Sequence, residues 1–186
     1  VTGMPTPPVR SLAGSVVAVV GAGGGLGSAV ARSLAARGAT LVLAGPHEDR
    51  LAAVGISGAT LVPLDLRDSR AGDRLVAAVE AMPGGRLDGV VNAAGRVAFC
   101  SLTDTDDVVI EELFLLNVLG PLWLARRTIP LLQASKGFLV NISAVVAEQP
   151  MAGMAAYSAT KGALTAADRA LGKELRRLGI HVCDAR

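Results

Sequence analysis

Short apolar runs alternate with amphipathic segments along most of this chain. The first run, "SVVAVVG" at 15–21, is β-branched and ends in glycine, and a helical pattern follows it through "LGSAVARSLAARG". Runs of this length and composition predict buried strands, and the segments between them predict helices. The predicted strands lie at 15–21, 40–45, 59–66, 87–95 and 137–143, and a sixth begins in "IHVCDAR".

Each predicted strand leads into a predicted helix. The longest helical regions run from about Asp106 to Ser135 and through "AAYSATKGALTAADRALGKELRRLG". Continuous apolar strands that alternate with helices indicate a parallel sheet buried on both faces, with right-handed crossovers. The expected fold class is therefore α/β, a three-layer, doubly wound parallel sheet.

Length and composition predict one domain. The chain has 186 residues, of which 51% are hydrophobic and 3% aromatic, as is typical of helices packed on buried strands. Residues 1–10 are Pro-rich without an apolar core, which predicts a flexible tail and no signal peptide, ahead of a single domain at 11–186. Charged residues, Asn, Pro or Gly interrupt the apolar stretches before they reach the length of a membrane span. We therefore expect a soluble cytoplasmic protein.

Charge and cysteine content argue against two further classes of protein. The net charge is +2 with both signs interspersed, which provides no basic footprint for nucleic acid. Cys100 and Cys183 lack the spacing of a metal site. We therefore expect no metal and interpret both cysteines as free buried thiols.

Glycine fills five of the seven positions in "GAGGGLG" (21–27), where the first strand leads into the first helix. The G-x-G-x-x-G fingerprint fails because Leu26 stands at its last glycine, whereas G-x-x-x-G-x-G fits Gly21, Gly25 and Gly27. Such glycines allow a tight turn, close approach of the backbone to a pyrophosphate, and phosphate binding at the helix N-terminus. The loop therefore predicts dinucleotide binding, and the absence of a following Lys-Ser/Thr excludes a Walker A loop.

Further motifs follow in order along the chain, and with the glycine loop they resemble those of the short-chain dehydrogenase/reductase family. A lone Y-x-x-x-K would be weak evidence, but five motifs at the family's spacing are specific. The four beyond the loop are Asp65 in "LDL", "NAAG" at 92–95, Asn117 in "NVLG", and Tyr157 with Lys161 in "YSATK".

The resemblance covers about residues 11–186 and implies a Rossmann fold with NAD(P)-dependent oxidoreductase activity. Two positions depart from the family pattern: Val20 replaces the Thr before the first glycine, and Ala93 replaces an Asn of N-N-A-G. The resemblance also implies that the last strand and the substrate-loop segment are missing, so the domain would be truncated at its C-terminus. The implied cofactor-binding residues are Gly21, Gly25, Leu26, Gly27, Asp65, Leu66, Asn92, Ala94, Gly95, Tyr157 and Lys161.

Tyr157 and Lys161 are four residues apart and share one face of the predicted helix. A lysine ammonium beside a phenol favours the phenolate, so we expect a lowered pKa for Tyr157, which would then exchange a proton with the substrate. The resemblance implies that Lys161 also holds the nicotinamide ribose, and that Asn117 fixes a water that relays protons to Lys161. Asn117 lies amid apolar residues, where a buried amide needs hydrogen-bond partners.

The choice of nicotinamide coenzyme depends on the end of the second strand. NAD binders usually carry an acidic residue there for the ribose 2′-OH, whereas this chain has Gly45 and Pro46. The missing carboxylate removes repulsion against a 2′-phosphate. The Arg that resembling NADP enzymes often carry is absent as well, with His47 and Arg50 as candidate substitutes. The prediction is NAD(P), with a lean to NADP.

The serine that polarises the substrate carbonyl in the family usually stands thirteen residues before the tyrosine, where this chain has Ala144. Two interpretations stay open. If the loop carries one extra residue, Ser143 takes the role and is a catalytic residue. If the strand stays extended, neighbouring side chains point to opposite faces, Ser143 points away, and the helper is lost.

Two functions from different classes follow. Tyr157, Lys161 and Asn117 favour an oxidoreductase that transfers hydride between NAD(P) and a carbonyl/alcohol substrate. Ala144 and Ala93, with the departure before the first glycine, favour a cofactor-binding, catalytically weak scaffold or sensor. We expect a small-molecule substrate and a homo-oligomer, a dimer or tetramer, because the long helical region is apolar beyond one stripe. Neither nucleic acid nor a membrane is an expected partner.

Overall fold

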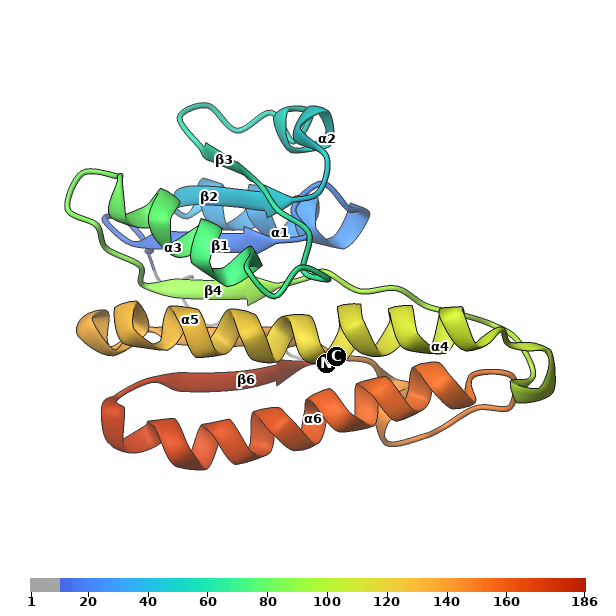
Figure 1. Cartoon of the computed structure of the whole chain (residues 1–186). Helices are drawn as coiled ribbons and strands as arrows, with labels where there is room; N and C mark the ends of the chain where they lie inside the picture. The colour runs from blue at the N-terminus through green and yellow to red at the C-terminus, as the bar shows by residue number, and fades with distance from the viewer. Residues whose placement is uncertain (1–10) are drawn as a thin grey trace, which may run out of the picture.

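The computed structural model describes residues 11–186, and the predicted tail at 1–10 lies outside the described residues. Six parallel strands form one sheet in the order β3-β2-β1-β4-β5-β6 (Figure 1). This order confirms the predicted doubly wound α/β fold. The strands are β1 (Val16–Val20), β2 (Thr40–Gly45), β3 (Thr60–Pro63), β4 (Gly89–Asn92), β5 (Phe138–Ile142) and β6 (His181–Ala185).

Helices connect the strands, and one pair of them is almost continuous. Helix α4 runs into α5 through one π-helical turn, and the two lie beside α6 and α3 (Figure 1). The helices are α1 (Gly25–Ala36), α2 (Glu48–Ala52), α3 (Ala71–Glu80), α4 (Asp107–Phe114), α5 (Gly120–Ser135) and α6 (Ala155–Leu175), with the π turn at Leu115–Leu119 and short 3-10 turns at Leu102–Asp104, Val145–Ala147 and Arg176–Leu178.

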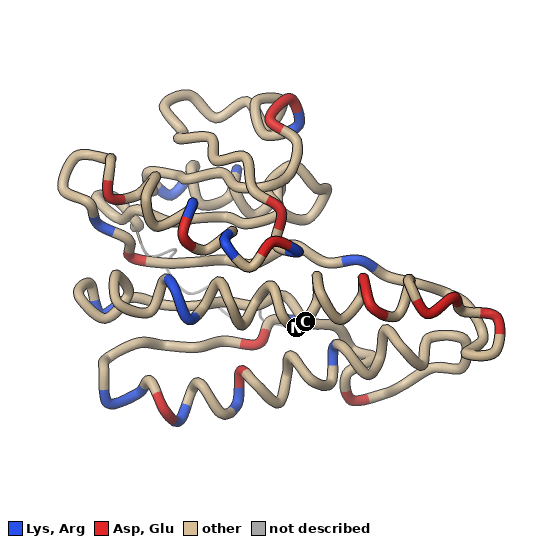
Figure 2. The backbone as a smooth tube through the Cα atoms, viewed as in Figure 1, with Lys and Arg blue, Asp and Glu red and all other residues tan. Residues whose placement is uncertain are grey.

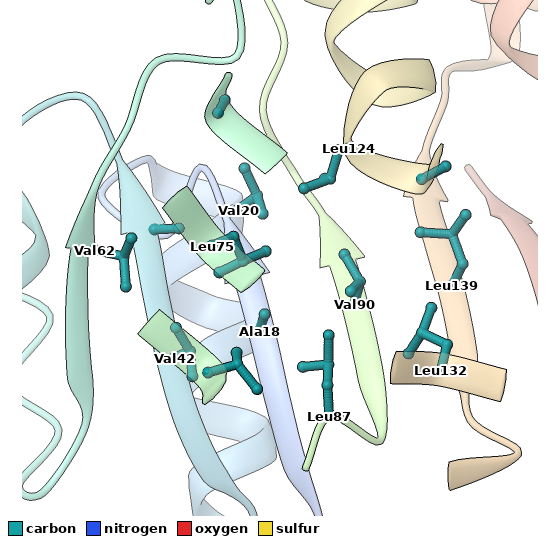
Figure 3. Close-up of a cluster of buried hydrophobic side chains, with 14 of the residues drawn as sticks. Ala18, Val20, Val42, Val62, Leu75, Leu87, Val90, Leu124, Leu132 and Leu139 are labelled. Carbon is teal, nitrogen blue, oxygen red and sulfur yellow. The ribbon is translucent and has the colours of Figure 1, made fainter. Parts of the chain in front are cut away.

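The core lies on both faces of the sheet, as continuous apolar strands require. In β1, Ala18 and Val20 belong to a cluster with residues of α3 and α5, whereas Val17 and Val19 belong to a cluster with residues of α1 and α2. Figure 3 shows the first cluster, where side chains of α3 and α5 lie over those of five strands. The labelled residues are Ala18, Val20, Val42, Val62, Leu75, Leu87, Val90, Leu124, Leu132 and Leu139.

The helical stretch Asp107–Ser135 has the length and composition of a membrane-crossing helix, with a mean hydropathy of 1.7 over its most apolar window. We expected Asn, Pro or Gly to interrupt every apolar stretch before it reached this length, and for this stretch the expectation is wrong. Asn117 lies inside the π turn and Pro121 lies in the first turn of α5, so neither residue ends the helical stretch. In this fold the stretch packs on α3 and α6, and 33% of the window is buried. The core helix of a folded domain meets the same criteria.

The cysteines differ from their interpretation as buried thiols. Both are free, and both are exposed. Cys183 lies on β6, which is an edge strand in the described sheet, and Cys100 lies in the connection after β4. The apolar character of cysteine predicted burial, but it does not show that these two positions lie at the protein surface.

Candidate active site

The predicted site residues converge on one edge of the sheet. The glycine turn follows β1, Asp65 follows β3, Asn92 ends β4, and Ser143 follows β5. The carboxyl ends of parallel strands meet at the same edge. Between β1 and β4 the chain reverses the direction in which it adds strands, and such a switch point is where doubly wound sheets bind ligands.

The turn after β1 is shaped by glycines that act in different ways. Gly21 has φ +80°, and a Cβ there would lie 2.6 Å from the backbone nitrogen of Ala94. A Cβ on Gly27 would collide with the carbonyl oxygen of Gly21, so this glycine lets helix and turn pack closely. A Cβ on Gly25 would meet nothing within 4 Å. The first residue of α1 therefore faces open space. An anion there can meet the free backbone N–H groups of the first turn of α1.

A cavity of about 280 Å³ lies between this turn and the end of β4. Five predicted cofactor-binding residues line it, namely Gly21, Asp65, Leu66, Ala94 and Gly95. The other six predicted residues do not line it: Leu26 is exposed, Gly27 packs inside the turn, Asn92 is buried, Gly25 faces open space, and Tyr157 and Lys161 lie on α6. The other lining residues are Val20, Gly24, Gly45, Pro46, Arg50, Leu64, Arg67, Ala93 and Leu116.

Asp65 is held by its own neighbour. Its carboxylate accepts hydrogen bonds from the backbone and side chain of Arg67, with the shortest at 2.6 Å, and these hold the pKa of Asp65 below its ordinary value. Arg67 also pairs with Glu112, one of the acidic residues of α4 (Figure 2). Glu112 pairs in turn with Arg96. Sequence reasoning missed Arg67 as a lining residue, although a basic residue two positions after Asp65 was a visible signal.

Tyr157 and Lys161 share one face of α6, as their spacing predicts. The Lys161 ammonium lies 5.9 Å from the centroid of the Tyr157 ring and donates a hydrogen bond to the carbonyl oxygen of Ile142 at 2.9 Å. Burial raises the pKa of the Tyr157 phenol, which differs from the expected lowering. The reason is that the ammonium is directed to the end of β5 and not to the phenol oxygen. Burial also lowers the pKa of Lys161, while the nearby carboxylates of Asp184 and Asp168 act in the opposite direction.

Asn117 is fully buried in the π turn, and its amide has partners on both sides. Its Oδ1 accepts from the backbone N–H of Arg96 at 2.9 Å, while its Nδ2 donates to the Arg96 carbonyl and to Thr160 Oγ1. A Cβ on Gly95 would lie 3.3 Å from Asn117 Oδ1 and 3.5 Å from Lys161 Nζ. Asn117 therefore ties the turn after β4 to α6, and π turns of this kind recur at functional sites.

Ser143 and Ala144 occupy different environments. The buried Ser143 hydroxyl lies 3.0 Å from Thr165 Oγ1, and the Thr165 hydroxyl donates to Asp184 at 2.9 Å. Since the Thr165 proton is used for Asp184, the Ser143 proton must go to Thr165. Ala144 is half-buried on extended backbone, with φ −160° and ψ 156°. In this arrangement the Ser143 hydroxyl bonds to α6 and not to the Tyr157 side chain.

A larger hollow of about 710 Å³ lies along β6 and α6, but no predicted site residue lines it. The smaller cavity at the glycine turn is therefore the better candidate for a cofactor. Its residues fit a dinucleotide, because the close contacts at Gly21 and Gly27 leave no room for side chains and the open position of Gly25 leaves room for phosphate.

Fold and site together define a dinucleotide-binding α/β protein with a Tyr–Lys pair beside the cofactor cavity. A family model described as short chain dehydrogenase matches residues 15–185. The chain belongs to this family of oxidoreductases, whose members use NAD(P).

Known proteins of similar sequence are described as uncharacterized oxidoreductases. The chain is 34% identical over 172 residues to an uncharacterized oxidoreductase of Staphylococcus epidermidis, covering 90% of this chain and 74% of that protein. An oxidoreductase of Staphylococcus aureus is 33% identical over 176 residues, which cover 92% of this chain and 76% of that protein.

Solved structures agree on the fold. A short-chain dehydrogenase from Streptomyces avermitilis is 34% identical with a TM-score of 0.84, covering 90% of this chain and 63% of that one. L-sorbose reductase of Gluconobacter frateurii, complexed with NADPH and L-sorbose, is 27% identical with a TM-score of 0.87. The match covers 93% of this chain and 69% of the reductase chain. The chain thus spans less than two thirds of the Streptomyces protein.

Proposed function

We propose that this protein is an NAD(P)-dependent oxidoreductase in which Tyr157 exchanges a proton with a carbonyl or alcohol substrate. One arrangement carries the proposal. Tyr157 and Lys161 lie together on α6, and Lys161 is next to Gly95, a residue of the coenzyme cavity. The coenzyme, when bound, supplies or accepts the hydride. The protein must then handle the proton, and Tyr157 is the hydroxyl acid at the site.

Different residues would bind different parts of the coenzyme. The open N-terminus of α1 at Gly25 would hold the pyrophosphate, and the Asp65–Arg67 corner would border the adenine. Lys161 would hold the nicotinamide ribose, since its ammonium lies beside the 93–95 turn. Asp65 and Arg67 line the cavity, Gly25 follows its lining residue Gly24, and Lys161 adjoins its lining residue Gly95.

The raised pKa of Tyr157 indicates which proton-transfer role the phenol has near neutral pH. A phenol with a raised pKa stays protonated near neutral pH and can therefore donate its proton to a carbonyl oxygen. We accordingly propose that Tyr157 is a proton donor near neutral pH, the role that reduction of a carbonyl requires. Oxidation of an alcohol requires the phenolate and thus a higher pH.

NADP(H) is the proposed coenzyme. Strand β2 ends at Gly45, and the adjoining space is lined by Pro46, His47 and Arg50, without a carboxylate that would repel a 2′-phosphate. Arg50 also borders the main cavity. The complex of L-sorbose reductase with NADPH agrees with this choice. Arg50→Ala should weaken binding of NADPH more than binding of NADH in a direct titration.

Ala144 supports a second candidate function, a coenzyme-binding scaffold with weak catalysis. No hydroxyl stands at that position, and the Ser143 hydroxyl is bonded to Thr165. Such a protein would bind NAD(P)H as a sensor or oligomer partner. It would have the same cavity but little turnover.

Coenzyme oxidation with a panel of ketones and aldehydes separates the two functions. We expect the wild type to consume NADPH with at least one substrate, and Tyr157→Phe to abolish consumption while coenzyme affinity stays close to that of the wild type. Coenzyme binding by both proteins without turnover by either would support the scaffold. Equal turnover by both would contradict Tyr157 as the acid.

A further inference from the structure

A line of buried hydrogen bonds runs from α6 across β5 and β4 to the 93–95 turn. Asn141 Nδ2 donates to Asp168 Oδ1 at 2.6 Å, Asn92 Nδ2 donates to Asn141 Oδ1 at 3.0 Å, and the Ala94 N–H donates to Asn92 Oδ1 at 3.1 Å. Asn92 and Asn141 are register partners in β4 and β5, which explains why the two amides meet. Asp168, Asn141 and Asn92 are 4%, 2% and 1% exposed.

All three hydrogen bonds in this line point the same way, and Asp168 sets the direction. An ionised carboxylate only accepts hydrogen bonds, whereas an amide side chain can turn over and exchange its donor and acceptor ends. With a carboxylate at the α6 end, Asn141 must direct Nδ2 toward it and Oδ1 toward Asn92. Asn92 then directs Oδ1 toward the Ala94 N–H. The reversed orientation would place the Asn92 amide protons against the Ala94 N–H.

The turn at the other end of the line borders two parts of the site. Ala94 is so close to the glycine turn that a Cβ on Gly21 would lie 2.6 Å from its nitrogen. Gly95 adjoins Asn117 and Lys161 on the other side. A small shift of this turn would therefore change the width of the coenzyme cavity and the surroundings of Lys161 together.

We propose that Asp168 is a positioning residue for coenzyme binding: it ends the amide line, keeps Asn92 Oδ1 directed at the Ala94 N–H, and so holds the 93–95 turn at the cavity. The inference rests on the proposed function, because it takes the coenzyme to bind at that turn. Asp168 reaches the 93–95 turn through Asn141 and Asn92, and its charge also acts on Lys161.

Burial disfavours the ionised form of Asp168 in the folded protein. Burial raises its pKa to about 6, and its Oδ2 has no hydrogen-bond partner in the described part of the chain. A raised pKa means that the folded state favours the protonated acid, so this group lowers stability as the pH rises from the ordinary pKa of an aspartate to about 6, with no further change above that. The charged groups that act on Asp168 are Asp184 of β6 and Lys161 of α6, while Arg169, Lys173, Arg176 and His181 line the same hollow.

Asp168→Asn tests the proposal, with Asp184→Asn as the matched control. Both variants remove a carboxylate that acts on Lys161, but only Asp168 belongs to the amide line. An Asn at 168 permits either direction of the line. We expect Asp168→Asn to accelerate hydrogen exchange of the Ala94 amide and to weaken NADPH binding roughly 3- to 10-fold, the loss of about one hydrogen bond. KM for the coenzyme should rise more than kcat falls.

The same variant should be at least as stable as the wild type above about pH 6, where Asp168 is ionised in the wild type. Asp184→Asn should leave exchange at Ala94 unchanged. Wild-type exchange and affinity in Asp168→Asn would overturn the inference, as would equal effects of the two variants or a loss of stability in Asp168→Asn. If the wild type binds neither NADPH nor NADH, the proposed function itself fails, and the inference fails with it.

Discussion

Ala144 lacks the hydroxyl that would polarise a substrate carbonyl, and Ser143 uses its own hydroxyl elsewhere. Tyr157 would then be the main side-chain donor to the developing alkoxide. Loss of one such donor typically costs about 10²–10³ in rate. Ala144→Ser should therefore raise kcat, although an introduced hydroxyl needs supporting contacts to be oriented.

Ser143→Ala is the matched variant, because it removes the neighbouring hydroxyl and leaves position 144 unchanged. We expect a small effect on kcat and a modest loss of stability, since the buried Thr165 loses a hydrogen bond of about 1 kcal/mol. Steady-state kinetics and thermal unfolding of both variants check this. A large loss of kcat in Ser143→Ala would show that Ser143 is the catalytic serine.

The raised pKa of Tyr157 predicts how the two reaction directions depend on pH. Carbonyl reduction requires the protonated phenol and should fall only as the pH rises through the pKa, above its ordinary value. Alcohol oxidation requires the phenolate and should rise over the same alkaline range. Rates in both directions against pH, with one substrate pair, provide the measurement. A reduction rate that falls through neutral pH would contradict the raised pKa.

Spacing predicted which side chains would meet but not their environments. Tyr157 and Lys161 were predictable because helical periodicity fixes their common face. The raised pKa of Tyr157 was not, since it comes from burial by the surrounding fold, and the Lys161 ammonium donates to the distant Ile142 carbonyl. Asn92 was expected at the cofactor, yet its amide is paired with Asn141, 49 residues away in sequence. Only the sheet register brings those two amides together.

At the scale of elements, the turn between β1 and α1 contains one glycine that matters for coenzyme binding and another that matters for folding. A Cβ on Gly25 meets nothing, whereas a Cβ on Gly27 collides with the Gly21 carbonyl. Gly25→Val should therefore fold and lose coenzyme affinity at least 10-fold, since its side chain enters the space proposed for the pyrophosphate. Gly27→Val should instead lower the midpoint of thermal unfolding. Unchanged coenzyme affinity in a folded Gly25→Val protein would count against this account of the turn.

The elements themselves were predictable because buried parallel strands are continuous apolar runs. The strand at 40–45 has the predicted bounds, but those predicted at 59–66 and 87–95 end earlier, at Pro63 and Asn92. The residues beyond these ends leave the sheet and line the cavity. They remain mostly apolar although they no longer pair with a neighbouring strand, so the apolar pattern overestimates the length of both strands. The π turn around Asn117 had no periodic signal, because it adds one residue per turn within a helical pattern.

At the scale of the whole molecule, α4, the π turn and α5 carry apolar side chains in contact with solvent. Val108, Leu119 and Leu122 are 63%, 39% and 36% exposed. We propose that this apolar surface joins two copies of the chain, beside α6. Light scattering at micromolar concentration should report a dimer or tetramer, and Leu122→Glu should shift it toward the monomer. A wild-type monomer under these conditions would contradict the proposal.

The most direct test of the central claim, that this fold transfers hydride with Tyr157 as the acid, is transfer of a label. NADPH carrying deuterium at the nicotinamide C4 position, on each face in turn, is incubated with an accepted ketone, and the alcohol is analysed by mass spectrometry. We expect deuterium in the alcohol from one of the two labelled coenzymes with the wild type, and none with Tyr157→Phe. Tight binding of the coenzyme without label in any product, across the substrate panel, would contradict the account and leave the scaffold function.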